Sequence, residues 1–336
     1  SAKVSQPTLA EFELAHQNVL KVAIETPILK SNYLTKLTGT DVYLKCENLQ
    51  RTGAYKLRGA YNRMSKLTSA ERKKGVVAAS AGNHAQGVAL AARKLGIKAT
   101  IFMPIGASLP KLQATENYGA EVVLTGAVFG ETLKAAQEYS AKKGAIFIPP
   151  FDHLDVIAGQ GTVGLEILEE LEGVDNIIVA IGGGGLAAGV ATAAKLKAAS
   201  MGRKIKVIGV QAKNASPYVQ SLKLGRPIEQ QITRTIADGI AVSKPGAIPF
   251  ALIKKNIDKV VTVSDDEIAK AIVVLLERSK MVVEPAGAVG VAAIMSGALK
   301  LKGRTVVILS GGNIDPLLLQ KVVGHGLAAA ERYTSI

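Results

Sequence analysis

The sequence predicts an α/β protein of two domains, in which parallel β-sheets are covered by helices. The chain has 336 residues, which is long enough for two domains with substantial cores. Hydrophobic residues make up 48% of the chain and charged residues 20%, a balance typical of folded rather than disordered proteins. Short β-branched runs alternate with helical stretches, and this alternation is typical of parallel sheets with crossover helices.

The expected strands and helices follow one another in a regular order. The β-branched runs predict strands over residues 76–79, 99–103, 121–124, 176–181, 206–210, 259–263 and 304–309. The stretches between them predict helices over residues 85–95, 110–118, 130–143 and 186–199, with a last helix from Pro316 onward. We expect the strand–helix units of residues 75–148 to form a small inserted domain. Residues 1–74 and 149–336 then form the large domain.

A net charge of +14 raises the question of a nucleic-acid partner. The basic residues are dispersed, in pairs such as Lys73–Lys74 and Lys254–Lys255, rather than gathered into one stretch. Aromatic residues make up only 4% of the chain, and the chain has no Trp. A solvated basic surface accounts for the charge, so the sequence predicts no nucleic-acid partner.

The sequence shows no sign of a membrane span, a secretory signal or a disulfide, and these features bear on the location of the protein. The apolar runs are too short to span a bilayer, so no membrane partner is expected. The segment Ser1–Glu11 lacks the apolar core of a secretory signal. Cys46 is the single cysteine and cannot form an internal disulfide, which fits a reducing compartment. We therefore expect a cytoplasmic protein.

A run of four glycines, Gly182, Gly183, Gly184 and Gly185, follows a predicted strand and precedes a predicted helix that starts at Leu186. Without a Cβ atom, each glycine lets its backbone approach a ligand closely. The helix N-terminus adds free N–H groups and a positive dipole end. A tight turn is the simpler interpretation, but a turn needs fewer glycines, so the run predicts a phosphate-binding loop.

The residues after the glycine run narrow the kind of phosphate ligand. A dinucleotide-binding fold has an acidic residue about 20 residues further on, at the end of the next strand. Here the next predicted strand ends at Gln211, so a dinucleotide-dependent oxidoreductase is disfavoured. The sequence also lacks the GxxxxGK[ST] pattern of a nucleotide P-loop.

Lys56 lies between Tyr55 and Leu57 and is the candidate catalytic nucleophile. Taken alone, it would be interpreted as a solvated lysine at the start of a helix. If it is desolvated next to a phosphate site, its pKa falls and its amine becomes nucleophilic.

These residues resemble the lysine motif of the fold-type II pyridoxal-phosphate (PLP) enzymes, and in particular the threonine dehydratase and serine racemase group. The resemblance extends from about Thr26–Pro27 to Gly312–Asn313, and the order of several separate motifs agrees with it. Besides the lysine segment and the glycine run, these motifs are Ser80–Gly87, Ala158–Thr162, Ala237–Gly239, Glu284–Ala288 and Ser310–Asn313. One departure is Ala54, where relatives usually carry Ser, so any role of a hydroxyl there is lost.

The resemblance implies PLP as the cofactor and a role for each motif. Lys56 would form the covalent bond to the cofactor and later move the Cα proton of the substrate. Residues Gly182–Leu186 would bind the cofactor phosphate, and Ser310 would face the pyridine nitrogen. Tyr55, Asn83, Gly239 and Glu284 would also contact the cofactor, and the substrate carboxylate would lie on Ser80, Ala81, Gly82, Asn83 and His84.

For two of these residues, a purely structural role explains the sequence as well as a role in the site does. His84 could be a capping or core histidine rather than a substrate ligand. Glu284 precedes Pro285 at an apparent helix start, where its charge would stabilise the helix dipole without any role in the site.

Ser310 and Ala81 bear on the type of reaction. A carboxylate beside the pyridine nitrogen would keep the ring protonated, and a serine cannot, which favours elimination. Racemases of the group carry a second acid, a serine, at the position of Ala81, and alanine cannot donate a proton. Their divalent-cation site is also missing two carboxylates here, because the matching positions are Gln211 and Pro217, so no Mg²⁺ or Ca²⁺ ligand residue is predicted. A backbone-carbonyl site for a monovalent cation is the alternative.

The resemblance therefore implies a threonine ammonia-lyase that converts L-threonine to 2-oxobutanoate and ammonia. The Pro149–His153 stretch resembles the threonine dehydratase form, with L-serine as a secondary substrate. The alternatives in the same cofactor class are a serine dehydratase and a serine racemase. An alternative of a different class is a binding protein on the same fold without catalytic activity. The resemblance also implies a homo-oligomer and a place in isoleucine biosynthesis or threonine catabolism.

Overall fold

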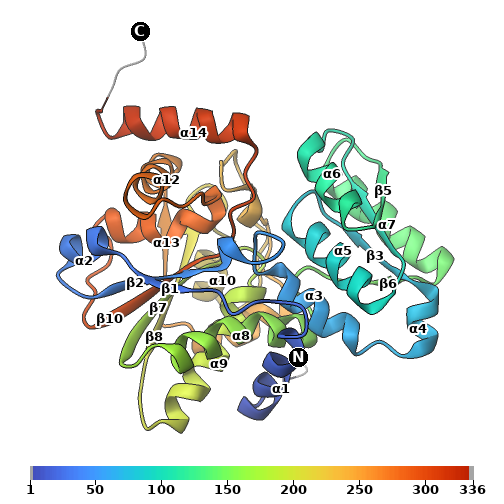
Figure 1. Ribbon diagram of the computed structural model, residues 1–336, viewed down its shortest axis with the longest axis horizontal. Coiled ribbons are helices and arrows are strands. Elements are labelled where there is room, and N and C mark those ends of the chain that lie inside the picture. Colours follow the sequence, from blue (N-terminus) through green and yellow to red (C-terminus); the bar gives the residue numbers. More distant parts are fainter. Residues whose placement is uncertain (1–2, 333–336) are drawn as a thin grey trace.

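The computed structural model describes residues 3–332, and within them it contains two β-sheets with helices packed on both faces (Figure 1). The predicted fold class is confirmed, because all but one of the strand pairings are parallel. The exception is the antiparallel pair at the start of the chain, in which Ile28 lies opposite Lys45.

The larger sheet has six strands in the order β1-β2-β10-β7-β8-β9. Their bounds are β1 Ile28–Lys30, β2 Val42–Cys46, β7 Val174–Ala180, β8 Lys206–Ala212, β9 Lys259–Val263 and β10 Arg304–Leu309. The last strand, β10, is inserted between β2 and β7, so the sheet joins both ends of the described chain.

The smaller sheet has four strands in the order β5-β4-β3-β6. Their bounds are β3 Val76–Ala79, β4 Ala99–Met103, β5 Glu121–Leu124 and β6 Ile146–Phe147. All four strands are parallel and come from one continuous stretch of chain, seen in cyan and green in Figure 1.

The helices of the first half of the chain are α1 Leu9–Val19, α2 Asn32–Thr38, α3 Lys56–Ser65, α4 Ser69–Lys74, α5 Asn83–Leu95, α6 Leu109–Asn117 and α7 Phe129–Lys143. Those of the second half are α8 Leu154–Glu170, α9 Gly185–Ser200, α10 Pro217–Leu224, α11 Ala247–Asn256, α12 Asp265–Ser279, α13 Pro285–Met295 and α14 Pro316–Ala329. Two 3₁₀ turns, η1 Glu47–Leu49 and η2 Asp238–Ile240, complete the described elements. Sequence signals explain several helix ends, as in α12, where Ser264 and Glu267 form a capping box.

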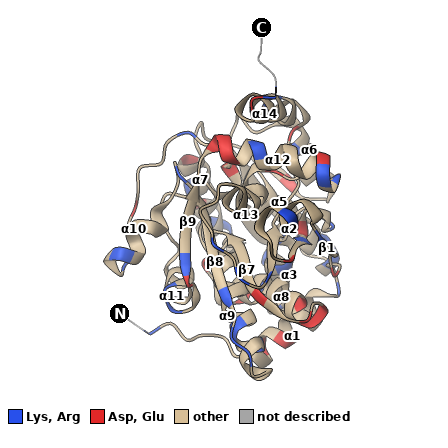
Figure 2. Cartoon of the chain, turned by 90° about the vertical axis from the view of Figure 1, so that its left-hand side faces the viewer, with Lys and Arg blue, Asp and Glu red and all other residues tan. Residues whose placement is uncertain are grey.

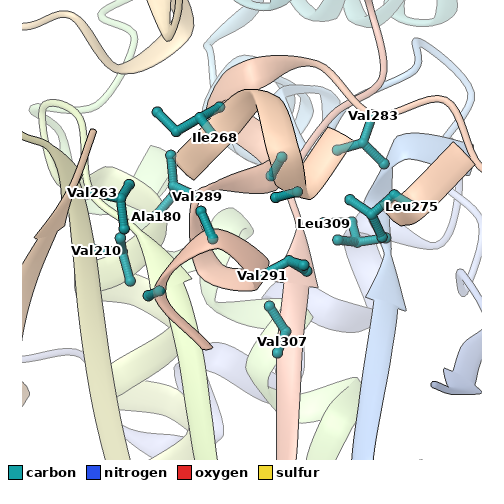
Figure 3. Packing of buried hydrophobic residues seen from close by; sticks show 14 of the residues in the cluster. Ala180, Val210, Val263, Ile268, Leu275, Val283, Val289, Val291, Val307 and Leu309 are labelled. Carbon is teal, nitrogen blue, oxygen red and sulfur yellow. The ribbon is translucent and has the colours of Figure 1, made fainter. Parts of the chain in front are cut away.

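Helices α12 and α13 cover one face of the larger sheet, and α8 and α9 cover the other. Figure 3 shows Val289 and Val291 of α13 between the strand residues Val210 and Val307 and the α12 residue Ile268. The smaller sheet packs against α3 and α5 on one face and against α7 on the other. The cores hold both sheets rigidly, which fixes the positions of the loops at their strand ends.

The predicted strands at 76–79, 99–103, 121–124, 259–263 and 304–309 are present with the same bounds. The strand predicted at 176–181 begins two residues earlier and ends at Ala180, and that predicted at 206–210 continues to Ala212. Periodicity could not reveal β1 and β6, because strands of three and two residues are too short to show a pattern.

Charged residues of both signs are interspersed on the face shown in Figure 2, on elements as far apart as α1, α10 and α12. On this face, the distribution agrees with a solvated charged surface rather than a basic stripe. Among the described residues, no helix combines the length and the apolar character needed to cross a membrane.

Candidate active site

Three of the predicted site segments follow strands at their carboxyl ends, where parallel sheets place binding sites. Ser310 directly follows β10, the glycine run follows β7 after one residue, and Ser80 directly follows β3. Because β10 and β7 are parallel neighbours, Ser310 and Gly182 lie at the same edge of the larger sheet. The structure therefore brings these distant motifs together, while their roles remain predictions.

The lysine segment is fixed beside the end of β10. The backbone N–H of Tyr55 donates to the Ser310 carbonyl at 3.1 Å, and Ala54 forms an isolated β-bridge with Gly311. Helix α3 begins at Lys56, so this residue is held by the bridge on one side and by the helix on the other.

The Lys56 side chain is half-buried and reaches across to the loop that precedes α8. Its Nζ donates to the Pro150 carbonyl at 3.0 Å and lies 5.4 Å from the centroid of the Tyr55 ring. Burial lowers the pKa of Lys56 to about 8, although the negative charge of Glu284 opposes part of this shift. A lysine with this pKa has a useful neutral fraction near physiological pH, as the sequence-based role requires.

The glycine run is packed so closely that side chains would not fit. A Cβ atom on Gly183 would lie 2.2 Å from the Phe151 ring, and one on Gly184 would lie 2.1 Å from the Tyr218 hydroxyl. Gly184 also has a φ of 107°, which side chains rarely tolerate. Phe151 follows Pro150, the partner of the Lys56 amine, so the lysine and the glycine run are in contact with the same loop.

The glycine run fits a phosphate because its backbone N–H groups are available as hydrogen-bond donors. Among the described residues, no protein acceptor pairs with the five backbone N–H groups from Gly182 to Leu186. Gly183, Gly184 and Gly185 are buried, and α9 begins at Gly185, so a helix dipole points its positive end here. Buried N–H groups need an acceptor, and a phosphate supplies several oxygens, so the run fits the cofactor phosphate better than a plain turn.

The Ser80–His84 loop folds around the serine hydroxyl. Ser80 Oγ accepts hydrogen bonds from the N–H groups of Gly82 at 3.1 Å and Ala85 at 3.2 Å. The loop thereby carries Ala81 and Gly82 into the first turn of α5, which starts at Asn83.

The contacts of His84 fit the simpler of its two predicted roles. Its ring Nε2 lies 2.8 Å from the Ile148 carbonyl, and the side chain is buried. Burial and the nearby Lys56 charge lower the pKa of His84 to about 3, so the ring is neutral and Nε2 carries the donated proton. These contacts favour a core histidine that fixes the helix start over a substrate ligand.

Glu284, in contrast, belongs to the hydrogen-bond network of the site. Its carboxylate accepts from Asn83 Nδ2 and from the Asn313 N–H, both at 2.9 Å. Asn313 Nδ2 also donates to Asn83 Oδ1 at 2.8 Å, which closes a hydrogen-bonded ring of three residues, with Asn313 contributing both its side chain and its backbone N–H. Burial, together with the charge of Asp238, raises the pKa of Glu284 to about 7. Gly239 adjoins this ring, since a Cβ atom there would lie 3.1 Å from Glu284 Oε1.

Sequence reasoning missed a buried ionic network beneath Lys56. Arg58, which is fully buried, donates from Nε to Glu47 at 2.6 Å and from Nη2 to Glu166 at 2.9 Å. Lys45 Nζ and His16 Nε2 lie 2.9 and 3.0 Å from the same Glu166 carboxylate. The one signal in the sequence was Glu166 itself, a lone carboxylate in the apolar run Val163–Leu168.

Pro150 and Asn313 were also given no role from the sequence, and each now contacts a predicted site residue. The structure has a cavity of about 1020 Å³ elsewhere, lined by residues of β1 and α2 and by Arg278, and no predicted site residue lines it. Within residues 3–332, no group of three or more His, Cys, Asp or Glu side chains is arranged to hold a metal ion.

Comparisons with known proteins agree with this geometry. Residues 19–311 match the family described as pyridoxal-phosphate dependent enzymes. The chain is 49% identical over 326 residues to an L-threonine ammonia-lyase of Thermotoga maritima, covering 97% of this chain and 80% of that protein. It is also similar to the structure of the processed form of threonine deaminase isoform 2 from Solanum lycopersicum, with 38% identity, a TM-score of 0.89 and coverage of 97% and 98% of the two chains.

A serine racemase from Dictyostelium discoideum has a similar structure as well, with 37% identity, a TM-score of 0.85 and coverage of 93% of this chain and 100% of that one. The fold is therefore shared by lyases and racemases, and the residues of the site must separate the two activities. The predicted resemblance and the predicted cofactor are both confirmed. The chain belongs to the family of pyridoxal-phosphate dependent enzymes.

Proposed function

We propose that this protein is a threonine ammonia-lyase, which converts L-threonine to 2-oxobutanoate and ammonia. The observation that carries the proposal is the half-buried Lys56 amine, whose pKa is lowered to about 8 and which lies beside a loop with five N–H groups that no protein acceptor pairs with in the described residues. The name of the Thermotoga maritima relative supports threonine as the substrate. The reaction is balanced: loss of water from threonine leaves an enamine, which takes up water and releases ammonia.

The cofactor would be held by residues of several elements. The N–H groups of Gly182–Leu186 would bind its phosphate, and Lys56 would bond to it covalently. Asn83 would contact the ring hydroxyl, Ser310 would face the ring nitrogen, and Tyr55, Gly239 and Glu284 would line the pocket. When bound, PLP supplies a conjugated ring that withdraws electrons from the Cα atom of the substrate.

Lys56 would accept the Cα proton of the substrate. With a pKa of about 8, roughly one tenth of its amine is neutral at pH 7 and can accept a proton. The Ser80–Asn83 loop would hold the substrate carboxylate through its polar groups at the start of α5. Because Ala81 has no proton to donate, the opposite face of Cα would receive none, which supports elimination over racemisation.

The proposal is tested by measuring oxo-acid release from L-threonine and from L-serine, with purified protein supplied with PLP. We expect 2-oxobutanoate from threonine to form faster than pyruvate from serine. One methyl group in a pocket changes kcat/KM by about 10- to 200-fold, so serine should remain a measurable second substrate. Pyruvate alone would move the assignment to a serine dehydratase, and the absence of any oxo acid would contradict a lyase.

The replacement Ala81→Ser is expected to raise the racemisation of serine. A hydroxyl at this position would supply the missing acid on the face opposite Lys56, and a general acid contributes about 10²–10⁴-fold to a rate. We expect D-serine formation from L-serine, measured by chiral chromatography, to increase at least about tenfold. Ala81→Gly, which adds no proton donor, is the matched control and should leave D-serine formation unchanged. An equal rise in both variants, or none in Ala81→Ser, would refute this role for the position.

We further infer that residues 75–148 form an inserted domain and that 1–74 with 149–336 form the large domain. The four strands of the smaller sheet and helices α5–α7 lie within 75–148, and the strands of the larger sheet lie outside it. Positions 1–2 and 333–336 of the large domain lie outside the described residues. We also propose a cytoplasmic homo-oligomer; light scattering of the purified protein tests the assembly, because a monomer mass would contradict it.

A further inference from the structure

Two buried polar side chains lie under the glycine run and have no part in the function proposed above. Gln211 is near the end of β8 and Tyr218 is in the first turn of α10, and both are fully buried. Gln211 Nε2 donates to the Ile181 carbonyl at 3.1 Å, and the Tyr218 hydroxyl donates to the Gly183 carbonyl at 2.8 Å. The N–H of Tyr218 in turn donates to Gln211 Oε1 at 3.0 Å, so the two side chains act together.

These two bonds fix the direction of N–H groups as well as carbonyls. In a planar trans peptide, the C=O of one residue and the N–H of the next point in opposite directions. Holding the Ile181 carbonyl therefore fixes the N–H of Gly182, and holding the Gly183 carbonyl fixes the N–H of Gly184. Both N–H groups are among those without a protein acceptor in the described part of the chain.

The peptide groups of a glycine loop need hydrogen bonds that fix their orientation more than those of other loops do. Glycine peptides rotate through a wider range of φ and ψ than any others, so a free run would sample many orientations of its N–H groups. The Gly183 carbonyl has a second donor, the N–H of Gly246 at 3.1 Å, and this donor comes from the loop before α11. Two independent donors on one carbonyl hold that peptide in one orientation.

We infer that Gln211 and Tyr218 are positioning residues of the phosphate site, which orient the N–H groups of the glycine run for the cofactor phosphate. This inference rests on the proposed function, because it takes the glycine run as the phosphate site. The Tyr218 hydroxyl remains a donor at all physiological pH values, since burial and the nearby Asp152 raise its pKa well above the usual range.

The test is the replacement Tyr218→Phe, which removes the hydroxyl and leaves the ring packed against Phe250. The dissociation constant is measured by equilibrium dialysis for two probes, PLP and pyridoxal, which lacks the phosphate. We expect the dissociation constant for PLP to rise about fivefold to tenfold, which is the effect of losing one buried hydrogen bond. The dissociation constant for pyridoxal should stay within about twofold of the wild-type value. Gln211→Met, which keeps the length of the side chain, should change the two constants in the same way.

Tyr139→Phe is the matched control, because Tyr139 packs against Phe102 of the smaller sheet, away from the glycine run. It should change neither dissociation constant. An equal loss of PLP and pyridoxal binding in Tyr218→Phe would overturn the inference, because the hydroxyl would then act on packing and not on the phosphate. Unchanged binding of both would overturn it too, because the hydroxyl would then have no effect on the site. A wild-type protein that binds no PLP would instead overturn the proposed function, and this inference with it.

Discussion

Replacing Lys56 with alanine is expected to lower the rate of threonine deamination by at least about a thousandfold. The variant loses both the covalent attachment of the cofactor and the base for the Cα proton. The neighbouring His84 does not replace this amine, because burial lowers the pKa of the ring and its Nε2 proton is donated to the Ile148 carbonyl. The measurements are 2-oxobutanoate release and the visible absorbance of the protein-bound cofactor, and both should be lost.

Lys66→Ala is the matched control for this prediction. Lys66 lies at the other end of α3 and forms a surface ion pair with Asp155 at 2.9 Å, which contributes little to stability. Its replacement should leave turnover and absorbance unchanged. In the Lys56→Ala variant, added ethylamine should restore part of the turnover by replacing the missing amine. Turnover near the wild-type level without added amine would refute the assignment of Lys56.

Replacing Arg58 with leucine is expected to lower the free energy of unfolding by about 3–5 kcal/mol. Arg58 is fully buried between two carboxylates, Glu47 and Glu166, and its removal leaves their charges partly uncompensated. Lys45 still neutralises part of the charge on Glu166. Denaturant unfolding followed by circular dichroism measures the change. Arg203→Leu, which breaks only a surface pair with Asp175, is the control and should change the free energy by less than about 1 kcal/mol.

The same network predicts how stability depends on pH. Burial alone would raise the pKa of Glu166, but hydrogen bonds from His16 and Arg58 and the charges of Arg58 and Lys45 hold this pKa well below its usual range. Its contribution is present above the pKa of an unfolded glutamate, about 4.3, and is lost as the pH falls below that value. The loss of stability in acid should be shallower for Arg58→Leu, and an identical slope would contradict this account of the network.

The sequence predicted the parts of the site that consist of local motifs. The glycine run, Lys56 and the Asn83 loop each have a pattern that is readable in a few neighbouring residues. The strand–helix alternation also places the glycine run and the Asn83 loop at strand ends. The Arg58 network has no such pattern. Its partner Glu166 is 108 residues away, and an arginine at a helix start is usually exposed, so only the packing of α3 against α8 shows that both are buried.

Glu284 and His84 show the same limit at single residues. Both had two interpretations from the sequence, because a helix start does not reveal which way its side chain points. Tertiary contacts favour one interpretation for each: Asn83 and Asn313 bind Glu284, and the Ile148 carbonyl accepts from His84. The contact of Tyr218 could not be predicted from the sequence for a similar reason, because its hydroxyl donates to a carbonyl that is 35 residues away in the chain.

The insertion of β10 between β2 and β7 has a consequence for synthesis on the ribosome. Until β10 emerges, β2 and β7 each present a strand edge without its partner, and Tyr55 and Ala54 lack the Ser310–Gly311 segment that anchors them. Exposed edges of this kind can pair with other chains. The nascent protein must therefore protect the edge of β2 from early in translation and the edge of β7 once that strand has been made, and the Lys56 segment gains its anchor only when β10 arrives.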